Sequence, residues 1–280
     1  MPMDQRVLLL GGTGRTGRLV LAQLVSRGVG VRAIVRSSLG LPAGTAGRPG
    51  VELVEASLLS LSDDELRHHL RGCTAVVSCL GHVLSVKGVL GPPRDLVTRA
   101  TTRLCQAIEA AQPARPIKLV LMSSVSVHQP GKLDARRGAF ERAFLCLLRG
   151  LLPPARDNQM AADFLRQAIG TGHPFVQWVV VRPDTLIQGE TSGYSLQAGL
   201  VSSLFAPGRT TMANVAHFMC ELVTDPWAWE EWKGRMPVIV DATGAMKPAR
   251  PGEPDPASRT PVEERSGVAG VPPESGRYRG

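Results

Sequence analysis

The sequence predicts an α/β protein with a doubly wound parallel sheet, and three features of the 280-residue chain lead to this prediction. Short runs of Val, Ile and Leu alternate with stretches of helical periodicity, as expected for successive βαβ units. Most of these runs are continuously apolar, which is typical of strands buried on both faces. Three glycines directly follow the first run, where a strand must turn sharply into a helix.

The expected elements follow one another without an internal repeat. Strands are predicted at 6–11, 30–36, 51–55, 74–80, 117–123, 177–182 and 237–241. Helices are predicted at 15–27, 62–71, 94–111, 157–169 and 212–224. Right-handed crossovers between such strands place a ligand at their carboxyl ends, where the strand order reverses.

The segment RVLLLGGTGRTG, residues 6–17, is the most informative part of the chain. Its glycines have the spacing G-x-x-G-x-x-G, and without a Cβ their backbone can approach a bound pyrophosphate closely. The helix that follows would direct its free N–H groups at that phosphate. We therefore predict dinucleotide binding by Gly11, Thr13, Gly14, Arg15, Thr16 and Gly17. The alternative is a tight strand-to-helix turn that binds nothing.

Composition argues against several other classes of function. The net charge is +8, but the arginines are scattered and lack interleaved aromatic residues, so we expect no nucleic-acid partner. The five cysteines include no C-x-x-C pair and form no ligand-spaced cluster with the six histidines, so we expect no metal site. Reduced thiols, no signal pattern and no membrane span predict a cytoplasmic protein.

One large domain is expected over residues 1–242, followed by a disordered Pro-, Gly- and Arg-rich tail at 243–280. The excursion at 128–156 departs from the regular alternation of elements. It contains an apolar helix at 138–152, which Pro153 and Pro154 are expected to end. We expect this helix to be a lid over the active site or an interface with a second subunit or a partner protein.

Four segments in order resemble the atypical branch of the short-chain dehydrogenase/reductase superfamily, which includes NmrA-like regulators and biliverdin/flavin reductase-like enzymes. They are GGTGRTG (11–17), VVSCLGH (76–82), LVLMSSVSV (119–127) and VVVRPDTL (179–186). The resemblance covers residues 5–242 and implies a Rossmann fold with a small substrate cap near 189–196. It adds further cofactor contacts, namely Ser57, Leu58, Cys79, Leu80, Gly81, Ser123 and Pro183. At Ser57 the acid that is common in relatives is missing.

The second predicted strand ends in Arg36-Ser37-Ser38, and we expect no acid nearby. A carboxylate at this position selects NAD by binding the ribose 2′-hydroxyl, whereas a guanidinium binds the extra phosphate of NADP. We therefore predict NADP(H) rather than NAD(H), held by Arg36 and by Arg15 from the glycine turn. The alternative is that both arginines are merely exposed to solvent.

The resemblance also implies a catalytic Ser with a Tyr-x-x-x-Lys pair, and this chain keeps only the first. Ser124 matches the Ser position, but the corresponding helix, DNQMAADFLRQ (157–167), has neither Tyr nor Lys. The two tyrosines of the chain, Tyr194 and Tyr278, lie elsewhere in the sequence. The usual proton relay for a secondary alcohol is therefore disfavoured, and so is nucleotide-sugar epimerisation.

Two functions remain open. The first is an NADPH-dependent reductase of an electron-poor acceptor, such as a quinone, a flavin or a conjugated carbonyl, which accepts hydride directly. Ser124 would bind the acceptor oxygen, and Asn158, His128 or His82 would orient the substrate or deliver a proton. Tyr194 in the cap is a weaker candidate for reaching the nicotinamide. The second function is a non-catalytic NADP(H)-binding redox sensor of the NmrA-like type.

Overall fold

The computed structural model describes residues 5–41, 44–82, 91–130, 152–203 and 207–242. The helix predicted at 138–152 lies outside these residues, apart from its last position, and so does the tail predicted at 243–280. None of the helices in the described ranges is long and apolar enough to cross a bilayer.

The centre of the fold is an eight-stranded sheet with the order β3-β2-β1-β4-β5-β6-β10-β8. Seven strands are parallel to their neighbours, and β8 runs antiparallel to β10. Their bounds are β1 Arg6–Leu10, β2 Gly30–Val35, β3 Val51–Glu55, β4 Ala75–Ser78, β5 Ile117–Met122, β6 Val176–Pro183, β8 Tyr194–Gln197 and β10 Val238–Asp241. The strand order reverses between β1 and β4, which confirms the predicted doubly wound sheet.

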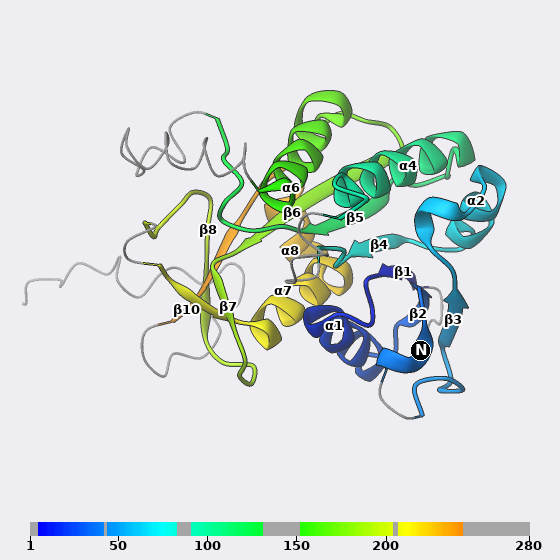
Figure 1. Ribbon diagram of the computed structural model, residues 1–280, viewed down its shortest axis with the longest axis horizontal. Coiled ribbons are helices and arrows are strands. Elements are labelled where there is room, and N and C mark those ends of the chain that lie inside the picture. Colours follow the sequence, from blue (N-terminus) through cyan, green and yellow to red (C-terminus); the bar gives the residue numbers. More distant parts are fainter. Residues whose placement is uncertain (1–4, 42–43, 83–90, 131–151, 204–206, 243–280) are drawn as a thin grey trace, which may run out of the picture. The chain divides into compact units, whose positions relative to one another are not determined.

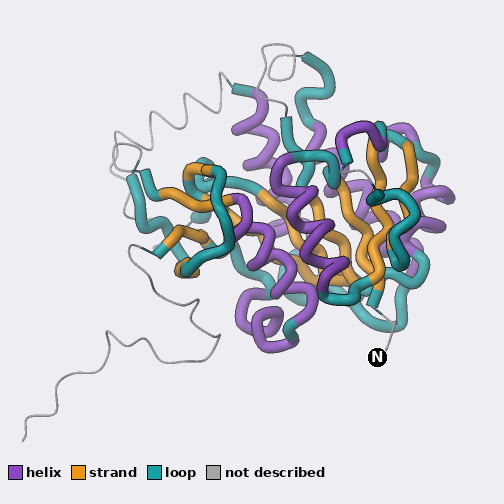
Figure 2. Tube along the Cα trace, turned by 90° about the horizontal axis from the view of Figure 1, so that it is seen from below, coloured by secondary structure: helices purple, strands orange, loops and turns teal. Residues whose placement is uncertain are grey.

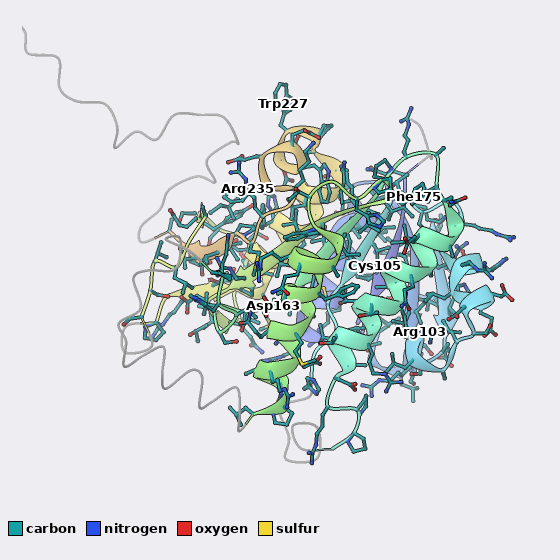
Figure 3. All side chains as sticks on the ribbon, turned by 90° about the horizontal axis from the view of Figure 1, so that it is seen from above. Arg103, Cys105, Asp163, Phe175, Trp227 and Arg235 are labelled. Carbon is teal, nitrogen blue, oxygen red and sulfur yellow. The ribbon has the colours of Figure 1, made fainter. Side chains whose placement is uncertain are left out.

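Helices cover both faces of this sheet (Figure 1). One face packs against α1 (Arg15–Ser26), α7 (Met212–Thr224) and α8 (Pro226–Trp232), and the other against α2 (Asp63–Leu70), α4 (Leu96–Ala111) and α6 (Pro153–Phe164). Figure 2 shows helices of the first group in front of the strands. Trp227 of α8 is 80% exposed and points away from the helix (Figure 3).

Strand β1 shows why these apolar runs become central strands. Val7 and Leu9 belong to the core beneath α1 and α7, whereas Leu8 and Leu10 belong to the core beneath α4 and α6. All four are at most 1% exposed. Burying such a side chain contributes roughly 1.5–3 kcal/mol, so an apolar residue is favoured at every position of the strand.

The structure differs from the sequence prediction in two places. Pro153 and Pro154 form the first turn of α6, which therefore begins before the predicted start at residue 157. Proline is well tolerated there because the first N–H groups of a helix lack intrahelical partners. The short strands β7 (Thr185–Ile187) and β9 (Arg209–Thr211), which pair in a small separate sheet, were not predicted, and neither were β8 and α8. Segments this short carry too little periodicity to detect.

Candidate cofactor-binding site

The glycine turn between β1 and α1 has the close packing that the sequence predicts. Gly11 has φ +73°, and a Cβ on it would lie 2.5 Å from the Cys79 carbonyl oxygen. A Cβ on Gly17 would lie 2.0 Å from the Gly11 carbonyl oxygen. The Gly14 amide donates to that same oxygen at 2.9 Å. Residues larger than glycine would therefore push the turn away from both β4 and α1.

The first turn of α1 is open to an anion. Gly14 is the N-cap and supplies no side-chain hydrogen bond, and the first turn contains no acidic residue. The amides of Arg15, Thr16 and Gly17 have no carbonyl partner within the helix. The positive end of the helix dipole and these amides together fit a pyrophosphate. The Thr13 side chain lies against Gly40, where an added Cβ would be 3.2 Å from the Thr13 Cβ.

Arg36 is exposed directly after β2, but the expectation that no acid lies near it is wrong in space. The register pairs Val35 with Glu55 of β3, and the Glu55 carboxylate accepts a hydrogen bond from the Ser38 amide at 2.7 Å. Bonds from the Ser38 hydroxyl and amide lower the pKa of Glu55. Sequence inspection missed this carboxylate because it comes from the neighbouring strand.

Arg15 lies on another side of the site. It lines a hollow of about 210 Å³ together with Arg18, Leu19, Gln188, Gly189 and Met212. These partners come from α1, from the segment after β7 and from the start of α7, whereas Arg36 follows β2 between β1 and β3. The assignment of Arg15 to a 2′-phosphate remains a prediction.

Five further predicted cofactor contacts follow β3 and β4 at the carboxyl edge of the sheet. Ser57 precedes a short 3₁₀ turn in which Leu58 is 6% exposed, and Arg103 of α4 donates to the Leu58 carbonyl at 2.9 Å. Cys79 is buried, and burial raises the pKa of its thiol, which fits a packing role rather than a reactive one. Leu80 and Gly81 follow it, and the Leu80 amide nitrogen would lie 3.0 Å from a Cβ on Gly11.

The serines that follow β5 have different environments. Ser123 is 7% exposed, and its hydroxyl has no hydrogen-bond partner among the residues that the structure describes. Ser124 is partly exposed, and its Oγ lies 2.5 Å from the Ser126 Oγ. The Val125 amide donates to the Pro183 carbonyl at 3.1 Å, so the ends of β5 and β6 are joined next to Ser124.

Helix α6 organises the loops at the same edge of the sheet. Gln159 accepts from the His128 amide at 2.8 Å and donates to the His128 carbonyl at 3.1 Å, which fixes the backbone after β5. Asn158 is partly exposed on the same helix. No described contact brings Ser124, Asn158 and His128 together as one catalytic group.

Asp157 is the residue of α6 that sequence reasoning overlooked. Its side chain is 0% exposed and accepts hydrogen bonds from the Val97 and Thr98 amides at 2.7 and 2.9 Å. It also accepts from the Thr98 hydroxyl and lies 2.9 Å from Nε2 of His82. One carboxylate therefore caps α4 and holds the histidine that follows β4.

Two further buried polar groups shape the substrate side. Arg182 of β6 is 0% exposed, and its guanidinium donates to the Met236 carbonyl at 2.8 Å and the Val127 carbonyl at 3.2 Å. The Tyr194 hydroxyl lies 2.9 Å from Nδ1 of His217 on α7, and burial raises the pKa of this phenol. Tyr194 is thus engaged with α7, away from the serines after β5. The described residues contain no group of three or more His, Cys, Asp or Glu side chains that could hold a metal ion.

Several solved structures of other proteins share this architecture. An oxidoreductase from Lactococcus lactis shares 19% identity at a TM-score of 0.61, covering 86% of this chain and 93% of its own. A Streptococcus pneumoniae protein described as an NADH-flavin reductase shares 17% identity at a TM-score of 0.59, covering 85% and 100%. A Bacillus halodurans protein described as an NAD-dependent epimerase/dehydratase shares 20% identity at a TM-score of 0.59, covering 85% and 94%.

These structural similarities establish the fold alone. No curated protein matches the chain in sequence. A family described as NAD(P)H-binding matches residues 11–226, which include the glycine turn, the ends of β2 to β6 and helix α7. The chain therefore belongs to this NAD(P)H-binding family.

Proposed function

We propose that this protein is an NADP(H)-dependent reductase that passes hydride directly to an electron-poor acceptor such as a quinone, a flavin or a conjugated carbonyl. The observation that carries the proposal is the composition of the sheet edge. It combines a glycine turn fitted to a dinucleotide with a partly exposed hydroxyl at Ser124, whereas α6 supplies neither Tyr nor Lys. Such acceptors need no phenol–amine pair to receive hydride.

The residues present fit the dinucleotide. The close contacts at Gly11 and Gly17 keep the turn small, and the uncapped start of α1 presents amides for the pyrophosphate. Because Arg36 is exposed directly after β2 and a guanidinium pairs well with phosphate, we propose NADP(H) as the coenzyme, with Arg36 as the partner of its 2′-phosphate. When bound, the coenzyme supplies the hydride. The chain positions the acceptor against it, and Ser124 donates a hydrogen bond to the acceptor oxygen as negative charge develops there.

The second candidate function is a redox sensor that binds NADP(H) without turning it over. The same absence of Tyr and Lys from α6 favours it, because such a protein needs the coenzyme site but no proton relay. It would transmit the redox state to a partner protein, as NmrA-like regulators do.

Turnover separates the two functions. Purified protein is mixed with NADPH and a panel of quinones and flavins, and NADPH oxidation is followed by its absorbance. A reductase oxidises NADPH only when an acceptor is present, whereas a sensor binds NADPH tightly and does not consume it. In a reductase, Ser124→Ala should lower kcat about tenfold or more with little change in the NADPH Kd. Equal losses in both would contradict the role given to Ser124.

A further inference from the structure

We infer that His82, held by Asp157, donates the proton that the reduced acceptor needs. This inference rests on the proposed reductase function and adds a catalytic residue to it. The resemblance to short-chain dehydrogenases/reductases implies that in those enzymes the proton comes from a Tyr-x-x-x-Lys pair on the helix that corresponds to α6. Here the same helix instead directs the carboxylate of Asp157 at the imidazole of His82.

Position supports this role. The register of β4 and β5 pairs Ser78 with Leu121, so the residues that follow the two strands lie side by side at the carboxyl edge. His82 follows β4 and Ser124 follows β5. The Cys79–Leu80 peptide, just before His82, packs directly on Gly11 of the glycine turn. His82 thus belongs to a segment that contacts the coenzyme turn and that follows the strand paired with β5, after which Ser124 comes.

Hydrogen bonding fixes which nitrogen of the ring is available. A carboxylate only accepts hydrogen bonds, so Nε2 of His82 must donate to Asp157 at 2.9 Å. Nδ1 has no hydrogen-bond partner among the described residues. The imidazole side chain is 4% exposed. A ring held in this way can carry a proton on Nδ1 and release it without turning.

Among the charged groups near His82, Asp157 is the partner of the imidazole ring. Within the described ranges it is the one carboxylate that lies within ion-pair distance of His82. Asp95 and Arg99, at the start of α4, are about half exposed and lie 3.9 Å from each other. Arg156, next to Asp157 on α6, is exposed. The bonds from the Val97 and Thr98 amides hold the Asp157 carboxylate beside the ring.

The step balances as follows. The acceptor would receive a hydride, which carries two electrons, from bound NADPH; its oxygen would then become negative and take the proton from Nδ1 of His82. The neutral ring keeps its Nε2–H on Asp157 and regains a proton on Nδ1 from water. The sum is one NADPH, one acceptor and one proton converted into NADP⁺ and the two-electron-reduced acceptor.

The first test needs no turnover. In the full-length protein labelled with ¹⁵N-histidine, long-range ¹H–¹⁵N spectra report the tautomer of each ring. The signal that disappears in His82→Gln should belong to a ring with its proton on Nε2. In Asp157→Asn the amide can still cap α4, and that ring should lose its fixed tautomer. A His82 ring with its proton on Nδ1 in the neutral form would overturn the inference.

The second test measures NADPH oxidation by a quinone. His82→Gln should lower kcat at least tenfold and leave the NADPH Kd unchanged. As a control, exposed His68→Gln should behave like the wild type. Wild-type turnover with an unaffected His82→Gln variant refutes the relay alone. An inactive wild type with every acceptor refutes the reductase function and the relay together.

Discussion

The coenzyme side and the substrate side of this sheet edge are built from different kinds of contact. On the coenzyme side, β1, the glycine turn and α1 are consecutive, and the tightest approach joins Gly17 to Gly11, although Gly11 also packs on Cys79. On the substrate side, His82 and Asp157 are 75 positions apart, and Arg182 joins the segment after β5 to the segment before β10. The glycine turn is therefore set mainly by one segment, whereas the substrate side exists only once the whole sheet has formed.

The largest effect is expected from a substitution in the glycine turn, which should weaken coenzyme binding. Gly17→Ala places a Cβ 2.0 Å from the Gly11 carbonyl oxygen, so the turn must shift away from α1. A strain of about 1–3 kcal/mol should weaken NADPH binding by about 10- to 100-fold, as measured by calorimetry.

Gly172→Ala is the matched control, because a Cβ there has no neighbour within 4 Å. It should bind NADPH like the wild type. If Gly17→Ala also retains wild-type affinity, the turn does not carry the coenzyme, and the two sides of the edge cannot be distinguished in this way.

The features that the sequence predicts correctly are those made by consecutive residues, and the features that it misses join distant residues. The strand-turn-helix at residues 6–26 was correct in position and packing because its signal lies in consecutive residues. The carboxylate of Glu55 was missed because it reaches Ser38 across a strand pair. Asp157 is predicted only as the first residue of a helix, because nothing in the local sequence shows that its carboxylate will form a hydrogen bond with His82. Pairs that depend on strand order and helix docking need the tertiary structure.

A smaller effect is expected from substitutions at the end of β2, which should change the preference for NADPH over NADH. If the 2′-phosphate binds at the end of β2, Arg36→Ala should lower the ratio of NADPH to NADH affinity about tenfold by removing a charge-assisted contact. Glu55→Gln should change the same ratio in the opposite direction by about threefold, because it removes a negative charge near that phosphate. Fluorescence titration with both coenzymes measures each ratio. An unchanged ratio in both variants would place the 2′-phosphate elsewhere.

The smallest functional effect is expected at Tyr194, which belongs to the assembled side but faces α7. Tyr194→Phe removes the hydroxyl that lies 2.9 Å from Nδ1 of His217 and keeps the ring that packs near Phe218. The free energy of unfolding in urea should fall by about 1 kcal/mol, the usual value for one intramolecular hydrogen bond. NADPH oxidation should stay at the wild-type rate, since the phenol is held away from the serines after β5. A loss of kcat without a loss of stability would bring Tyr194 into the active site and remove the need for a proton from His82.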